Sequence, residues 1–226
     1  KRNRMKNTKS LKMKINLIEF FAENAVKFSA NTAVVDGDRT ITFGALDEKA
    51  RMLASVLVEK TGIKNKPIAM FLPKCIEAVQ TDLAITYSGN AYMNWDVKNP
   101  SERLSNILAL IQPVAIVTNS RYLKLIEPIA GKNIVVINLD EIEEKEAPSQ
   151  TYFFDRNKDL IDTDPYCIIN TSGSTGTPKG VVLNHKSFID FMAQTFDEYN
   201  FNEKDVIGSL SPVIFDIWSY ELCMLQ

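Results

Sequence analysis

Short apolar runs alternate with longer amphipathic segments through the first two thirds of this sequence. The strand-like runs are residues 67–72, 91–95, 114–118 and 134–139, and the helix-like segments are residues 46–57, 76–87, 101–111 and 122–129. Parallel strands need a long crossover connection, which a helix normally supplies. The alternation therefore predicts an α/β fold with largely parallel, helix-covered sheets.

The ends of this region indicate how the chain is divided. Residues 1–14 carry seven basic side chains and no acidic one, which is typical of a basic disordered leader. Acidic residues and a proline make residues 141–150 an exposed connector. We therefore predict a first α/β subdomain over residues 15–150 and the start of a second over residues 151–226. Residues 33–35 and 40–43 are expected to pair as a hairpin, and Ser101 to cap the helix that follows.

Composition excludes some function classes. The formal net charge of −2 gives no basic surface for nucleic acid. No apolar run approaches the roughly 20 residues of a membrane span. The three cysteines, Cys75, Cys167 and Cys223, lie far apart within apolar runs and show no metal-ligand spacing. They are expected to be small buried residues of a cytoplasmic protein.

The segment from Thr171 to Gly180 has the composition of a polyphosphate-binding loop. Its ten residues include three glycines, five hydroxyl side chains and Lys179. Glycines let backbone N–H groups approach an anion closely, hydroxyls add donors, and a lysine adds a mobile positive charge. An apolar run, residues 166–170, comes directly before the loop, and a second, residues 181–183, follows it.

Other interpretations of this loop are weaker. A Walker A loop requires Ser or Thr after its lysine, but Gly180 follows Lys179 here. The spacing of Gly173, Gly176 and Gly180 also differs from the dinucleotide fingerprint. A solvated Ser/Gly linker stays open as an alternative, although strands directly on both sides favour a functional loop.

The amino-acid sequence of this segment resembles the phosphate-binding signature of the adenylate-forming superfamily, which includes the adenylation domains of nonribosomal peptide synthetases. Two other parts of the sequence are similar to motifs of the same superfamily. The matching segments are residues 171–187, residues 89–96 with 99–104, and residues 215–221. Within the second segment, Asn94 and Trp95 replace the usual proline and aliphatic residue.

The resemblance implies an ATP-dependent ligase that activates a carboxylate as an acyl-adenylate for transfer to a thiol, with ATP and Mg²⁺ as cofactors. The thiol would belong to a carrier protein's phosphopantetheine or to coenzyme A. No metal-ligating residue and no catalytic residue is assigned within this chain. The implied phosphate-binding residues are Thr171, Ser172, Gly173, Ser174, Thr175, Gly176, Thr177, Lys179 and Gly180.

The resemblance also implies that Asp216 and Tyr220 bind the substrate, because amino-acid-activating members place an aspartate here to pair with the α-ammonium group. Asp216 lies among apolar residues, where a lone carboxylate is costly. The alternative is that Asp216 caps the helix expected from Ile217 to Leu225. His185 is the only histidine, and it is expected to open a helix and bond a backbone group instead of acting as a base.

The resemblance places this chain as an N-terminal portion of a longer enzyme, since the superfamily's adenosine-binding segments and catalytic lysine would follow Gln226. The 226-residue chain by itself is then expected to catalyse no ATP–pyrophosphate exchange. Two alternatives stay open. One is an acyl- or aryl-CoA synthetase. The other is a non-catalytic nucleotide-binding or interaction module with the same fold.

Overall fold

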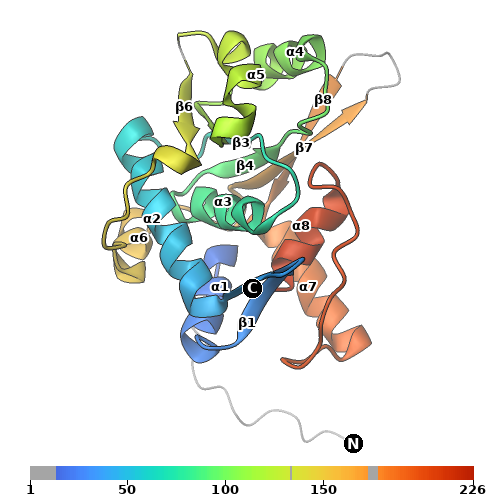
Figure 1. The fold of residues 1–226 in the computed structure, drawn as a ribbon. Coiled ribbons are helices and arrows are strands. Elements are labelled where there is room, and N and C mark those ends of the chain that lie inside the picture. Colours follow the sequence, from blue (N-terminus) through green and yellow to red (C-terminus); the bar gives the residue numbers. More distant parts are fainter. Residues whose placement is uncertain (1–13, 133, 173–177) are drawn as a thin grey trace, which may run out of the picture.

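The computed structural model describes residues 14–132, 134–172 and 178–226 (Figure 1). The strands are β1 (Thr32–Asp36), β2 (Arg39–Thr42), β3 (Pro67–Met70), β4 (Ala91–Asn94), β5 (Ala115–Thr118), β6 (Val135–Asn138), β7 (Pro165–Ser172) and β8 (Pro178–Asn184). In the part of the chain that the structure describes, β1 and β2 form the predicted antiparallel hairpin. The other strands form one sheet in the order β6-β5-β3-β4-β7-β8.

The sheet is parallel except at one edge. Strands β3, β4, β5 and β6 run parallel to one another, and β7 is parallel to β4 where Tyr92 lies opposite Cys167. Strand β8 returns antiparallel to β7. The expected α/β class is therefore confirmed. Strands β7 and β8, which follow residue 150, belong to the same sheet as β3 to β6. The sheet therefore does not mark a boundary there, and the division of the chain at residue 150 stays a prediction.

The helices cover both faces of this sheet. They are α1 (Leu17–Lys27), α2 (Phe43–Thr61), α3 (Ile76–Tyr87), α4 (Ser101–Ile111), α5 (Ser120–Ala130), α6 (Gln150–Arg156), α7 (His185–Tyr199) and α8 (Asp216–Cys223), with a 3-10 turn over Leu139–Glu141. Helices α4 and α5 lie on one face, and α3 and α2 lie on the other (Figure 1). Helices α1, α7 and α8 join the α2–α3 side, because their buried residues share its core.

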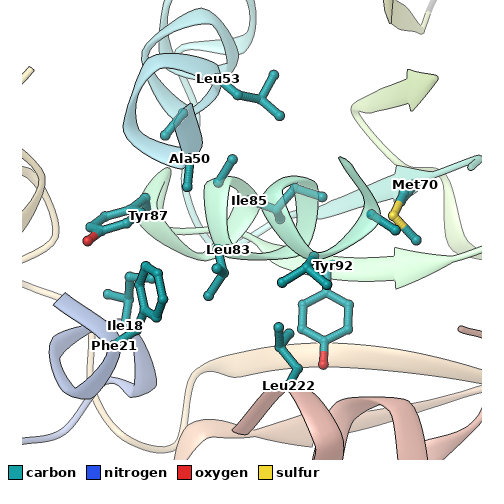
Figure 2. Close-up of a cluster of buried hydrophobic side chains, with 14 of the residues drawn as sticks. Ile18, Phe21, Ala50, Leu53, Met70, Leu83, Ile85, Tyr87, Tyr92 and Leu222 are labelled. Carbon is teal, nitrogen blue, oxygen red and sulfur yellow. The ribbon is translucent and has the colours of Figure 1, made fainter. Parts of the chain in front are cut away.

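The larger core lies between the sheet and the α2–α3 layer. Figure 2 shows Phe21 of α1, Ala50 of α2 and Leu83 of α3 among its side chains, with Tyr92 of β4 and Leu222 of α8 beside them. A second cluster fills the α4–α5 face. Burial of these apolar surfaces is the main driving force that holds the helices on the sheet.

Local chemistry explains several helix ends. Asn16 caps α1 by accepting a hydrogen bond from the Ile18 N–H at 3.0 Å, and Asn184 accepts one from Ser187 at 2.8 Å at the start of α7. Gly62 follows the last residue of α2 and caps the helix, and its φ of 67° favours glycine.

The sequence-based expectations need three corrections. Ser101 does not cap α4, because the residue before the helix is Pro100 and no side chain bonds there. Helix α6 occupies residues that composition did not mark as helical. Cys75 is only partly buried, whereas Cys167 and Cys223 are buried as expected. Within the described ranges, the structure contains no helix long and apolar enough to cross a bilayer.

Candidate functional site

The hairpin of β7 and β8 holds both ends of the glycine-rich segment. Thr171 on β7 lies directly opposite Lys179 on β8, and both are exposed. Opposite residues of an antiparallel pair project from the same face of the sheet. The Lys179 ammonium and the Thr171 hydroxyl therefore flank the segment together. Among the described residues, Lys179 forms no ion pair, so its charge is available to an anion.

Gly180 has a packing role on the opposite face of the hairpin. A Cβ atom on Gly180 would lie 2.5 Å from Cδ1 of Ile111 at the end of α4 and 3.1 Å from Cγ2 of Ile168. Gly180 therefore lets α4 approach the hairpin closely. Side chains alternate along a strand, so Thr171 and Lys179 project from the other face of the sheet, on which α8 packs without burying these two residues.

Five of the predicted phosphate-binding residues, Gly173, Ser174, Thr175, Gly176 and Thr177, lie outside the described residues. Ser172 is described only as the last residue of β7. The donors in the described part are the Lys179 ammonium, which has no ion-pair partner there, and the Thr171 hydroxyl. They suit a phosphate, because ammonium and hydroxyl groups donate hydrogen bonds to phosphate oxygens. The described ranges contain no cluster of three or more His, Cys, Asp or Glu that could hold a metal ion.

Asp216 is the first residue of α8 and is exposed. The residue before the helix is Phe215, which makes no side-chain cap. Among the described residues, the one donor to Oδ1 of Asp216 is the N–H of its neighbour Ile217, at 2.9 Å. Asp216 is therefore not the N-cap. The apolar surroundings expected from the sequence are also wrong for this carboxylate, because it faces outward and not into the core.

Tyr220 lies one turn further along α8 and lines a cavity of about 470 Å³ between α7 and α8. Its ring meets Phe191 of α7 edge-on, with ring centroids 5.7 Å apart. Glu198 and Tyr199 also line this cavity, whereas Asp216 does not. The structure therefore places both predicted substrate residues on one short helix but only Tyr220 in the cavity.

Two charged side chains fix the segment that leads to α8. The Glu221 carboxylate accepts hydrogen bonds from the N–H of Leu210 at 3.1 Å and from the hydroxyl of Ser209. Lys74 donates to the carbonyl oxygens of Ser209 and Ser211 at 2.6 and 2.8 Å. The approach to Asp216 is thus held by side chains from α8 itself and from the loop before α3.

His185 has the structural role expected of it. It is the first residue of α7, it is 3% exposed, and its Nδ1 accepts a hydrogen bond from the Leu17 N–H at 3.2 Å. Burial lowers the pKa of His185 to about 4. An imidazole that accepts this bond is neutral, so His185 joins α7 to α1 and does not act as a proton carrier near neutral pH.

We expect His185 to make the protein sensitive to acid. Its folded pKa lies below the ordinary value of 6.5, so stability is present above pH 6.5 and is lost as the pH falls towards 4. The shift corresponds to about 3 kcal/mol of unfolding free energy. His185→Asn keeps an acceptor and removes the titration. Urea denaturation of both proteins from neutral pH to about pH 4 should show the difference, and equal pH slopes would contradict this account.

Sequence reasoning missed one buried acid near α8. Asp82 lies inside α3, fully buried, and burial raises its pKa to about 7. An acid among the apolar residues Ala78, Val79, Leu83, Ala84 and Ile85 of α3 was the available signal. Its partners could not be read from spacing, since Trp218 is 136 residues away.

Comparison with known proteins shows which family this chain is similar to. The sequence model of the AMP-binding enzyme family matches residues 21–225. The chain is 30% identical to tyrocidine synthase 1 of Brevibacillus parabrevis over 206 residues, which is 91% of this chain and 18% of that protein. It is 31% identical to a dimodular nonribosomal peptide synthase of Bacillus subtilis (strain 168), over 92% of this chain and 9% of that protein.

Solved structures share the fold. The nonribosomal peptide synthetase FmoA3 superposes with a TM-score of 0.79 at 22% identity, over 92% of this chain and 21% of that one. VinN in complex with L-aspartate gives a TM-score of 0.77 at 15% identity, over 92% of this chain and 54% of that one. The chain thus spans less than a fifth of the two curated relatives named above.

Proposed function

This chain belongs to the AMP-binding enzyme family, and from that premise we propose that it contributes to an ATP-dependent ligase that activates an amino acid. The amino acid's carboxylate attacks the α-phosphate of ATP, and the bond to pyrophosphate breaks. The resulting aminoacyl-adenylate then passes its acyl group to the phosphopantetheine thiol of a carrier protein, and AMP leaves. We propose a cytoplasmic enzyme, since its three cysteines are free thiols.

One observation carries this proposal. Thr171 and Lys179 project from the face of the sheet on which α8 packs, and Asp216 is the first residue of α8. The hydroxyl of Ser219 on α8 contacts Cys167 on β7 at 3.8 Å. Cys167 is four residues before Thr171, which is about 13 Å along a strand. An ATP-binding loop and an amino-acid site would therefore be neighbours.

The residues of this chain would act by position and charge. Lys179 and Thr171 would bind the β- and γ-phosphates together with the residues of the segment 172–177 and Gly180. Attack at the α-phosphate and departure of pyrophosphate gather negative charge on the phosphate oxygens, so fixed donors lower the barrier. Bound Mg²⁺ would neutralise part of that charge and take most of its ligands from phosphate and water oxygens.

Asp216 would pair with the substrate's α-ammonium group. A carboxylate at the beginning of α8, with no partner beyond its neighbour's N–H among the described residues, can accept such a bond. Tyr220 would line the space for the substrate's side chain, because it faces the cavity between α7 and α8. An acid without the amine would leave Asp216 unpaired and would be a poorer substrate.

We expect Lys179→Ala to weaken the use of ATP without affecting the fold. The loss should be about 1–3 kcal/mol in kcat/KM for ATP, the range for a hydrogen bond that involves a charged group. Thermal unfolding should hardly change, since Lys179 is exposed. Lys158→Ala, which removes another exposed lysine, is the matched control for ATP–pyrophosphate exchange. If Lys179→Ala lowers the melting temperature while its ATP kinetics stay normal, the loop is structural.

A further inference from the structure

Two side chains, one from β4 and one from α8, meet at a buried carboxyl group of α3. Asn94, the last residue of β4, donates its Nδ2 to Oδ2 of Asp82 at 2.8 Å. The indole N–H of Trp218 donates to the same oxygen at 2.7 Å. Asp82 and Trp218 are 0% and 3% exposed, and Asn94 is 6% exposed. The cluster therefore joins α3, β4 and α8 inside the larger core.

The atoms that lack partners suggest the protonation state of this cluster. Among the described residues, Oδ1 of Asp82 and Oδ1 of Asn94 accept no hydrogen bond. Both atoms are acceptors. The amide and the carboxyl group that carry them are already joined by the hydrogen bond from Nδ2 of Asn94 to Oδ2 of Asp82. A proton on Oδ1 of Asp82 would turn that atom into a donor for Oδ1 of Asn94. One proton would thus satisfy both oxygens, and it would remove the cost of an unpaired buried charge.

The surroundings of Asp82 favour the neutral acid. The titratable groups that interact with it are Tyr92 on β4 and Cys167 on β7. Burial raises the pKa of Tyr92 well above its usual value and that of Cys167 to about 12, so both are neutral at physiological pH. Among the described residues, no cation bonds to Asp82. The ammonium group of Lys74 lies 5.9 Å from the centre of the Trp218 ring.

The same cluster holds the backbone on both sides of Asp216. Nδ2 of Asn94 also donates to the carbonyl oxygen of Val213 at 3.2 Å, three residues before Asp216. Trp218 follows Asp216 by two residues. A short turn leads from Val213 to Asp216, in which the Phe215 N–H donates to the carbonyl oxygen of Pro212 at 3.2 Å. The position of Asp216 therefore depends on two contacts that meet at Asn94 and Asp82.

Asn94 also explains where this chain departs from the motif it resembles. The adenylate-forming motif has proline at this position, and proline carries no side-chain amide. Asn94 donates two hydrogen bonds there, one to Asp82 and one to Val213. The substitution thus supplies the partner that a buried acid in α3 requires.

We propose that Asp82 and Asn94 form a neutral acid–amide pair that positions Asp216 by holding Val213 and Trp218. Asp82 is a positioning residue here, since it acts on the substrate only through α8. The positioning role rests on the proposed function of Asp216, whereas the acid–amide pair does not. Raising the pH removes the proton, which leaves Oδ1 of Asp82 and Oδ1 of Asn94 buried with no donor between them, and this loosens the start of α8.

Tryptophan fluorescence of the 226-residue chain tests the pair without any substrate. In Trp95→Phe, Trp218 is the sole tryptophan, and its emission should titrate with a midpoint near pH 7, the pKa of Asp82. Adding Asp82→Asn, which mimics the neutral acid, should abolish that titration. Trp218→Phe leaves the buried Trp95 as the matched control, and its emission should stay constant. A titration that is missing, or that survives Asp82→Asn, overturns the proposal.

Kinetics of the protein that carries this chain test the positioning role. Trp218→Phe should raise KM for the amino acid roughly tenfold, the factor typical of one hydrogen bond, and Trp95→Phe should leave it unchanged. KM of the wild type should rise above about pH 7, while KM of Asp82→Asn should stay level. Equal KM values for the two tryptophan variants would overturn the role. If Asp216→Ala has no effect on its own, the proposed function fails, and the fluorescence result still decides the pair.

Discussion

Replacing Asp216 with alanine is expected to lower kcat/KM for the amino acid by a factor on the order of 100. The carboxylate would lose a charge-assisted hydrogen bond to the α-ammonium group, and such bonds contribute up to about 3 kcal/mol. The deaminated analogue cannot make this bond and should lose much less. The comparison needs ATP–pyrophosphate exchange rates for both acids, measured with the wild type and with Asp216→Ala.

Asp190→Ala is a suitable control for this experiment. Asp190 is an exposed aspartate on the neighbouring helix α7 and pairs with Lys186 at 2.7 Å on the surface. Such pairs contribute little, so this variant should keep normal kinetics for both acids. An equal loss for the amino acid and its deaminated analogue in Asp216→Ala would show that Asp216 acts on the fold of α8 and not on the amine.

The second large effect expected is a loss of stability as the pH rises. The pKa of Asp82 is raised from 3.8 to about 7 in the folded chain, so the folded state binds more protons than the unfolded state between these values. The stabilising proton is fully present below pH 3.8 and is lost as the pH rises through 7. The shift corresponds to about 4 kcal/mol of unfolding free energy.

Asp82→Asn should remove this dependence, because an amide does not titrate in this range. His185 acts in the opposite direction below pH 6.5, so the measurement is clearest when both proteins carry His185→Asn. Urea denaturation between about pH 4 and pH 8 would give the two slopes. Parallel slopes with and without Asp82 would mean that this carboxyl group is ionised throughout.

Much of the fold could be predicted from the sequence, because it depends on local periodicity. The helix predicted over residues 76–87 coincides with α3, and the hairpin of β1 and β2 follows from the Gly37 turn, where φ is 60°. Helix α6 could not be predicted, since its seven residues carry no clear apolar period and follow a charged connector. Ser101 failed as a cap because a cap depends on where a helix begins, and that varies by one or two residues.

The candidate site was predictable only in part. The flanks of the glycine-rich segment followed from the apolar runs beside it, and pairing then placed Lys179 opposite Thr171. The buried environment predicted for Asp216 was wrong, because apolar neighbours in sequence do not show which side of a short helix meets solvent. The partners of Asp82 depend on tertiary packing over more than a hundred residues, and no local pattern encodes such contacts.

The most direct test of the central claim is ATP–pyrophosphate exchange by the protein that carries this chain, with a panel of amino acids and their deaminated analogues. The account predicts exchange with at least one amino acid, a much weaker signal with its deaminated analogue, and loss of the signal in Asp216→Ala. Exchange that is supported only by fatty or aryl acids, with coenzyme A as the acyl acceptor, would contradict the account and identify an acyl-CoA synthetase.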